Sequence, residues 1–156
     1  MKKYAFLILV FISFNANSQI SNLQEVMLFA RLTVGDISYN LKKWKYEKTK
    51  EEKNGNVITR NTFYYTKDNL KQIVERVSTY TPQYGFSSES TYFYSNTPDL
   101  VNTVKKSLKS EGFVLKNTMY NSPVYRSEVF MLGIINSAKM NPDYKKGYHL
   151  IQTILR

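Results

Sequence analysis

The chain has 156 residues, no cysteine and one histidine, and its 22 Lys and Arg residues outnumber its 12 Asp and Glu residues, for a formal net charge of +10. Disulfides are excluded, and a zinc site is disfavoured because zinc draws its ligands from several Cys, His and carboxylate groups. Six glycines, none in a Gly-rich phosphate-binding pattern, argue against nucleotide-dependent chemistry, so we expect no cofactor.

Residues 1–18 have the pattern of a secretory signal peptide of bacterial style. Lys2 and Lys3 precede an apolar run over 5–14, and Ala16 to Ser18 place small residues where signal peptidase reads. The run is well short of the roughly 20 residues of a membrane-spanning helix. We expect cleavage between Ser18 and Gln19, which lowers the charge to +8 and leaves a secreted or periplasmic domain over 19–156 with no integral membrane span.

Residues 21–43 have a helical pattern. Ser21 and Gln24 fit a capping box, and apolar residues recur at intervals of three and four as far as Trp44. Gly35 interrupts this pattern at a cost of about 1 kcal/mol relative to alanine. The sequence therefore predicts either one helix over this segment or a helix that breaks near Gly35.

Strands are expected after this helical segment. Asn54-Gly55 lies between residues 44–51 and 56–66 and predicts a hairpin, because both residues tolerate positive φ. Residues 70–80 fit either a helix behind Asp68 or a strand, and the β-branched residues favour a strand. The next elements are a loop over 81–85 and a strand over 89–95.

A second helix is predicted between Thr97 and Gly112. Thr97 would be its cap, Pro98 would lie in the first turn, and Gly112 would end it. Three strands are then expected, over 113–120, 125–135 and 147–155. Residues 130–135 are apolar on both alternating faces, which is typical of a central strand.

These elements predict an α+β fold in which helices pack on an antiparallel β-sheet. Residues 21–95 and 97–156 present the same order of elements, which suggests two related halves. Each half is small for independent stability, so we expect them to share one core. Common hairpin chemistry would also produce such a likeness, so the sequence leaves the duplication open.

Few residues are suited to catalysis. His149 lies within a predicted strand, and no nucleophile-elbow pattern accompanies it, so we interpret it as structural. Glu51-Glu52 is interpreted as a solvated hairpin tip rather than a calcium site. A glycoside hydrolase with paired carboxylates stays open, with Glu128 as the first residue to test. The candidate carboxylates are Glu75, Glu89, Asp99, Glu111 and Glu128.

Aromatic and basic residues are the remaining candidates for a site. Tyrosines beside lysines suit a binding platform, although aromatics also pack within ordinary sheets. The candidate binding residues are Trp44, Tyr64, Tyr92, Tyr94, Lys105 and Lys106.

The sequence favours an exported, non-enzymatic binding protein for a protein, a glycan or an anionic envelope polymer. The alternatives are a small carboxylate-dependent hydrolase and an inhibitor or immunity-type protein against a secreted enzyme. Export disfavours nucleic acid as a partner, and the positive charge argues against basic, lysozyme-like enzymes as targets.

Overall fold

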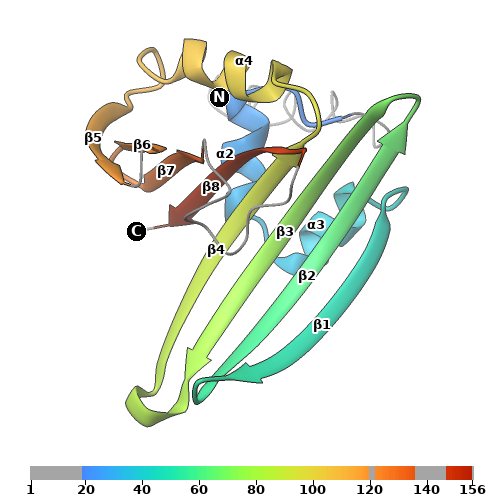
Figure 1. Ribbon diagram of the computed structural model, residues 1–156, viewed down its shortest axis with the longest axis vertical. Coiled ribbons are helices and arrows are strands. Elements are labelled where there is room, and N and C mark those ends of the chain that lie inside the picture. The colour runs from blue at the N-terminus through green and yellow to red at the C-terminus, as the bar shows by residue number, and fades with distance from the viewer. Residues whose placement is uncertain (1–18, 120–121, 136–146, 156) are drawn as a thin grey trace, which may run out of the picture.

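The computed structural model describes residues 19–119, 122–135 and 147–155, and within them it shows three α-helices and one open antiparallel sheet of eight strands (Figure 1). The predicted signal peptide lies outside the described residues. The helices are α2 (Leu23–Arg31), α3 (Val34–Asn40) and α4 (Asp99–Ser107). The strands are β1 (Lys45–Lys53), β2 (Asn56–Lys67), β3 (Leu70–Thr81), β4 (Phe86–Ser95), β5 (Val114–Met119), β6 (Ser122–Arg126), β7 (Phe130–Ile135) and β8 (His149–Leu155).

The strands are ordered β1-β2-β3-β4-β8-β7-β6-β5 across the sheet. The first four follow one another, and the last four run in reverse, so that β8 pairs with β4 in the middle. Strands β1 and β5 are the two edges. Each half of the chain thus contributes a helical segment followed by four strands, while common descent of the halves stays a prediction.

The first helical segment consists of two helices that separate at Leu32 and Thr33. The Thr33 hydroxyl accepts a hydrogen bond from the Asp36 backbone N–H at 3.2 Å, and the Asp36 carboxylate accepts one from the Thr33 N–H at 3.3 Å. This capping box starts a new helix because it satisfies N–H groups that have no partner within the helix. The expected break near Gly35 therefore lies two residues earlier.

The predicted caps of the two longer helices are wrong. Helix α2 is capped by Asn22, whose side chain accepts a hydrogen bond from Glu25 N–H at 2.9 Å, and not by Ser21. Asn is as effective a cap as Ser, so the sequence contained two adjacent candidates. Helix α4 starts after Pro98 without a side-chain cap, and the Thr97 hydroxyl lies 3.4 Å from the Ser95 hydroxyl instead.

We expect Thr33→Ala to lower the free energy of unfolding by about 1 kcal/mol, because the substitution removes one half of the capping box. Urea unfolding, followed by the fluorescence of the single tryptophan, measures the change. Thr33→Ser is the matched control, since it keeps the capping hydroxyl and should retain most of the stability. Equal losses in the two variants would show that the hydroxyl does not hold this helix start.

Two strand predictions are confirmed. Strands β1 and β2 form the hairpin around Asn54 and Gly55, which have φ of 52° and 75°. Residues 70–81 form strand β3, which is paired on both sides, with β2 and with β4.

The prediction of one strand over 125–135 is wrong. The chain turns at Ser127 between β6 and β7, and the Ser127 N–H donates to the Phe130 carbonyl at 3.0 Å. This turn, Ser127 to Val129, contains neither Gly nor Pro, so it carries no breaker signal. Strand β7 is nevertheless interior, between β6 and β8, with Phe130, Leu132 and Ile134 buried.

The two faces of the sheet carry different clusters of buried residues. On the face that we call the helix face, Phe63, Val74 and Phe93 belong to one cluster with apolar residues of α2, α3 and α4. This cluster draws on both halves of the chain. On the opposite face, a smaller cluster of five buried residues includes no helix residue. Its members are Ile73, Val77, Tyr92, Tyr94 and Leu150.

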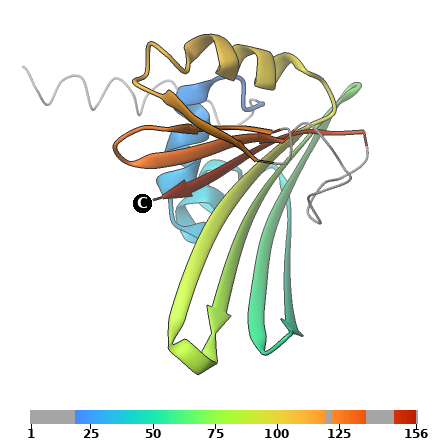
Figure 2. The same cartoon turned by 60° about the vertical axis from the view of Figure 1, so that its left-hand side comes forward.

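Strands β1–β4 are longer than the helices can cover. Figures 1 and 2 show them continuing past α3 as an arm. We define this distal arm as residues 48–60 and 78–90, and none of its residues is buried. The arm therefore depends on strand pairing rather than on a core, and it exposes both faces to solvent.

Candidate functional site

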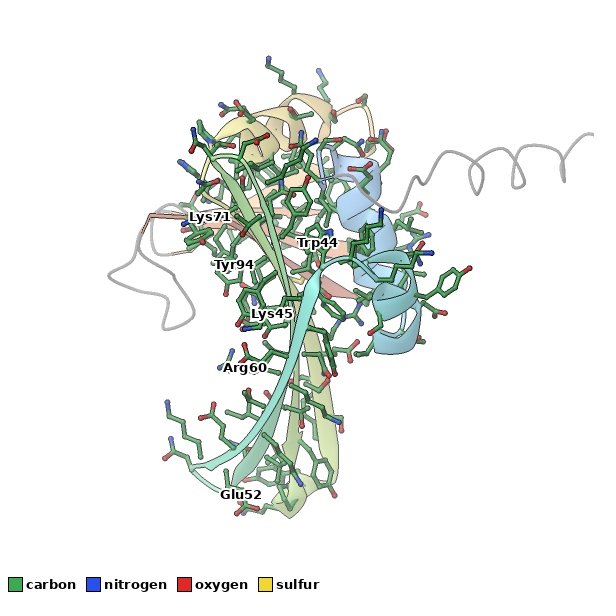
Figure 3. All side chains as sticks on the ribbon, turned by 90° about the vertical axis from the view of Figure 1, so that its right-hand side faces the viewer. Trp44, Lys45, Glu52, Arg60, Lys71 and Tyr94 are labelled. Atoms are coloured by element: carbon green, nitrogen blue, oxygen red, sulfur yellow. The ribbon has the colours of Figure 1, made fainter. Side chains whose placement is uncertain are left out.

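The predicted binding residues do not form one surface. Trp44 is buried on the helix side, in the main cluster, and its ring lies 5.0 Å from that of Tyr65. Figure 3 shows Trp44 on the helix side of the sheet and Tyr94 on the other. Lys105 and Lys106 are exposed in the last turn of α4, where basic side chains complement the helix dipole.

The three predicted tyrosines share the opposite face. Tyr64 and Tyr94 flank Ile73 across β2, β3 and β4, and Tyr92 is paired with Glu75. The rings of Tyr92 and Tyr94 stack with centroids 6.3 Å apart. Both of these tyrosines are buried, whereas Tyr64 is half-buried, so only Tyr64 offers a ring to solvent.

A buried carboxylate, Glu75, lies at the centre of these tyrosines. It accepts hydrogen bonds from the Tyr94 hydroxyl at 3.2 Å and from the Thr62 hydroxyl at 3.4 Å, and Arg60 Nη1 lies 3.5 Å from it. Arg60 also reaches Glu51 at 3.7 Å. A buried charge with this many partners is compensated, which is typical of a structural network.

Tyr64 lies at the edge of this network. Burial raises the pKa of its phenol, and a hydrogen bond to Glu47 and the charges of Glu47 and Glu75 raise the pKa further. The Lys45 ammonium lies 5.7 Å from the centre of the Tyr64 ring, within reach of a cation–π contact. The phenol is thus kept protonated, as a hydrogen-bond donor rather than a base.

The carboxylates proposed for hydrolysis are dispersed. Glu75 faces the opposite side of the sheet from Glu89, which pairs with Arg76 on the helix face. Glu128 is exposed in the β6–β7 turn, and Glu111 accepts a hydrogen bond from Gln24 at 2.6 Å. Among the described residues, no group of three or more His, Cys, Asp or Glu side chains could hold a metal ion.

His149 begins β8 and is exposed, opposite Ser95 of β4. His149 belongs to neither cluster of buried residues, and its interpretation as structural stays a prediction.

The far end of the arm carries aromatic residues that sequence reasoning did not single out. Tyr84 and Phe86 are 76% and 60% exposed, and Tyr80 is 45% exposed. They lie in and beside the β3–β4 connection, next to the β1–β2 turn. The Thr81 hydroxyl joins the two turns by donating to the Asn56 side-chain oxygen at 2.6 Å. We call Tyr80, Tyr84 and Phe86 the arm tip.

The segment around the arm tip has the composition of a recognition surface. Residues 77–88 contain no charged residue, although 22% of the chain is charged, and they consist largely of Ser, Thr, Tyr and Phe. Protein interfaces are depleted in charge at their centres, and paratopes are rich in Tyr and Ser. The absence of charged residues over 77–88 was visible in the sequence. The exposure of the aromatic side chains was not, because it results from the position of this segment at the end of the distal arm.

The chain matches no family model, and the comparisons with curated proteins and with solved structures found no match. Among the described residues, none of the helices has the length and apolar character required to cross a membrane.

Proposed function

We propose that this protein is an exported, non-enzymatic binding protein that holds a partner protein at the arm tip. The observation that carries the proposal is the exposure of Tyr84 and Phe86 at the end of an arm without a core. Tyr80 is exposed at the same end but on the other face of the sheet, because Phe86 is paired with its neighbour Thr81. Large apolar rings in water are unfavourable for a monomer, and they are the residues that dominate binding energy in interfaces.

The chemistry of the tip favours a protein over the other partners predicted from the sequence. An anionic polymer would be held by a cluster of cations, whereas residues 77–88 contain none and the neighbouring β1–β2 turn offers Lys53 only beside Glu51 and Glu52. A hydrolase would need a carboxylic acid in a protected site, whereas the carboxylates of that turn are exposed. Aromatic rings with hydroxyl groups around them suit a protein surface, which offers both apolar and hydrogen-bonding groups. The inhibitor or immunity-type alternative is one form of this activity.

The arm would also limit the entropic cost of binding. Pro82, whose ring restricts φ, starts a 3-10 turn over Pro82–Tyr84, and Gly85 ends it in the left-handed conformation with φ of 60°. A preorganised turn loses less conformational freedom when a partner binds.

The test is capture of partners on the immobilised protein from the envelope fraction and medium of the exporting cell. We expect Tyr84→Ser combined with Phe86→Ser to weaken capture at least 30-fold, the equivalent of about 2 kcal/mol for loss of aromatic anchors. Tyr39→Ser is the matched control, because Tyr39 on α3 is 77% exposed but lies outside the arm. Capture that survives the double substitution, or that is competed by glycans alone, would contradict the proposal.

A further inference from the structure

Exposed apolar residues divide between the two halves of the chain by chemical type. Among the large apolar residues that the structure describes as exposed, those in the first half are aromatic, whereas those in the second half are aliphatic. The aliphatic ones are Val114, Leu115, Val129, Ile154 and Leu155. We call these five residues the aliphatic rim.

The strand register places the rim residues at one end of four neighbouring strands, with Val114 and Ile154 on the face opposite the helices and Leu155 on the helix face. One row of paired residues crosses the four strands. It runs from Val114 of β5 through Arg126 of β6 and Met131 of β7 to Ile154 of β8. In the adjacent row Leu155 is paired with Phe130, the residue after Val129. Figure 2 shows these strand ends on one side of the molecule, away from the arm tip.

Basic side chains accompany the rim. Arg126 lies within the row itself, and Arg31 lies over the ring of Phe130, 4.9 Å from its centre. Two further lysines are exposed: Lys109 lies between α4 and β5, and Lys116 lies within β5. The acids nearby are Glu128, in the β6–β7 turn, and Glu111, which is hydrogen-bonded to Gln24. The rim thus combines aliphatic side chains with an excess of positive charge.

We propose that the aliphatic rim rests on the surface of an anionic lipid bilayer. Short aliphatic side chains enter the boundary between headgroups and acyl chains, while Arg and Lys side chains stay at the phosphates. The positive charge of the whole chain attracts the protein to such a surface before contact. Binding of this kind requires no membrane-spanning segment.

A second copy of the chain fits the rim less well. Strand β5 is the free edge beside the rim, and its register shifts between Leu115 and Asn117, which places a bulge at Lys116. Bulges and lysines on edge strands oppose pairing with another chain. A dimer would also bring Arg126 and Lys116 close to their counterparts.

The test is flotation of the purified protein with vesicles of 30% phosphatidylglycerol and 70% phosphatidylcholine, and with vesicles of phosphatidylcholine alone. We expect binding to the anionic vesicles only, and we expect it to weaken as salt rises. Val129→Ser combined with Ile154→Ser should weaken binding by about tenfold or more, and Arg126→Gln by about fivefold. The far-UV circular dichroism of each variant checks that the fold is retained.

The control is Lys48→Gln combined with Lys50→Gln, which removes two exposed charges from the edge strand β1. It should leave vesicle binding within about twofold of the unmodified protein, because these lysines lie in the arm. Three results would overturn the proposal: no binding to anionic vesicles, equal losses in the control and rim variants, or a dimer that the rim variants dissociate. The arm-tip variant Tyr84→Ser with Phe86→Ser should retain vesicle binding, so failure of either proposal can be recognised separately.

Discussion

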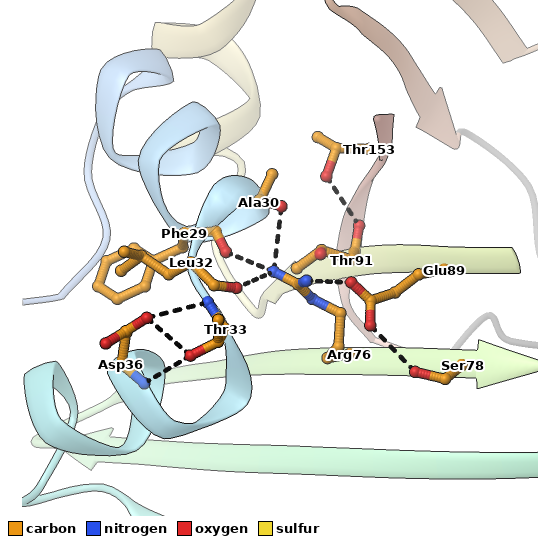
Figure 4. A network of polar contacts seen from close by, with 10 residues as sticks. All are labelled: Phe29, Ala30, Leu32, Thr33, Asp36, Arg76, Ser78, Glu89, Thr91 and Thr153. Atoms are coloured by element: carbon orange, nitrogen blue, oxygen red, sulfur yellow. Dashed lines mark hydrogen bonds and ion pairs between the residues drawn. The ribbon is translucent and has the colours of Figure 1, made fainter. Parts of the chain in front are cut away.

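Replacing Arg76 with methionine is expected to lower the free energy of unfolding by about 3–5 kcal/mol, because it leaves three backbone carbonyls at the end of α2 without their donor, at about 1–3 kcal/mol each. Arg76 is 3% exposed, between β3 and the end of α2. Its Nη2 donates to the carbonyls of Phe29, Ala30 and Leu32 at 2.8, 3.1 and 2.8 Å, and its Nη1 pairs with Glu89 (Figure 4).

The physical reason is that the Arg76 guanidinium caps the C-terminal end of helix α2 by donating to its last carbonyls. The last carbonyls of a helix have no partner within the helix. The C-terminal end of a helix also carries a partial negative charge, which attracts a positively charged side chain. Methionine would fill much of the volume but leave these carbonyls and Glu89 without the guanidinium. Because β3 supplies the arginine, the same contact fixes α2 to the start of the arm.

Urea unfolding gives the change in stability, and hydrogen exchange at the end of α2 shows where it acts. Lys48→Met is the control, since it removes an exposed basic side chain from β1 and should change stability by less than about 0.5 kcal/mol. A loss below about 1 kcal/mol in Arg76→Met, or unchanged exchange at the end of α2, would show that the helix is held by other contacts.

Phe93→Ala is expected to lower the free energy of unfolding by about 3–5 kcal/mol, because it removes a large side chain from the centre of the core. Phe93 is 1% exposed and lies on β4, paired with Val74 on one side and Ile151 on the other. Strand β4 pairs with β8 and so joins the two groups of four strands, and a cavity at Phe93 weakens this pairing.

The matched control is Phe86→Ala, the same chemical change on the same strand. Phe86 is exposed at the arm tip and should change stability by less than about 0.5 kcal/mol. Thermal and urea unfolding of both variants make the comparison. Similar losses for Phe86 and Phe93 would mean that the arm tip is packed, which would also remove the basis of the proposed binding site.

Local signals in the sequence were sufficient for most elements. The Asn54-Gly55 hairpin depends on two residues that tolerate positive φ, and the helical segments depend on apolar spacing. The errors lie where a boundary has no strong local signal. The turn at Ser127 has no Gly or Pro, and the cap of α2 was ambiguous because Ser21 and Asn22 are adjacent.

The candidate site was less predictable than the fold, because aromatic residues serve both as core and as binding groups. Trp44, Tyr92 and Tyr94 were candidates by residue type, and the structure places them among buried residues. Tyr84 and Phe86 have the same chemistry but lie at the end of the distal arm, where no helix covers the strands. The absence of charged residues over 77–88 is the local signal that accompanies Tyr84 and Phe86, and it does not by itself predict their exposure.

The sequence by itself determined the α+β class, the absence of disulfides and the Asn54-Gly55 hairpin, because composition and backbone preference act within a few residues. Only the tertiary structure decided which face each aromatic residue occupies, the exposure of the arm tip and the assembly of the aliphatic rim. Those properties arise from strand pairing between residues far apart in the chain, such as Thr91 and Thr153, and pairing at that distance leaves no local trace.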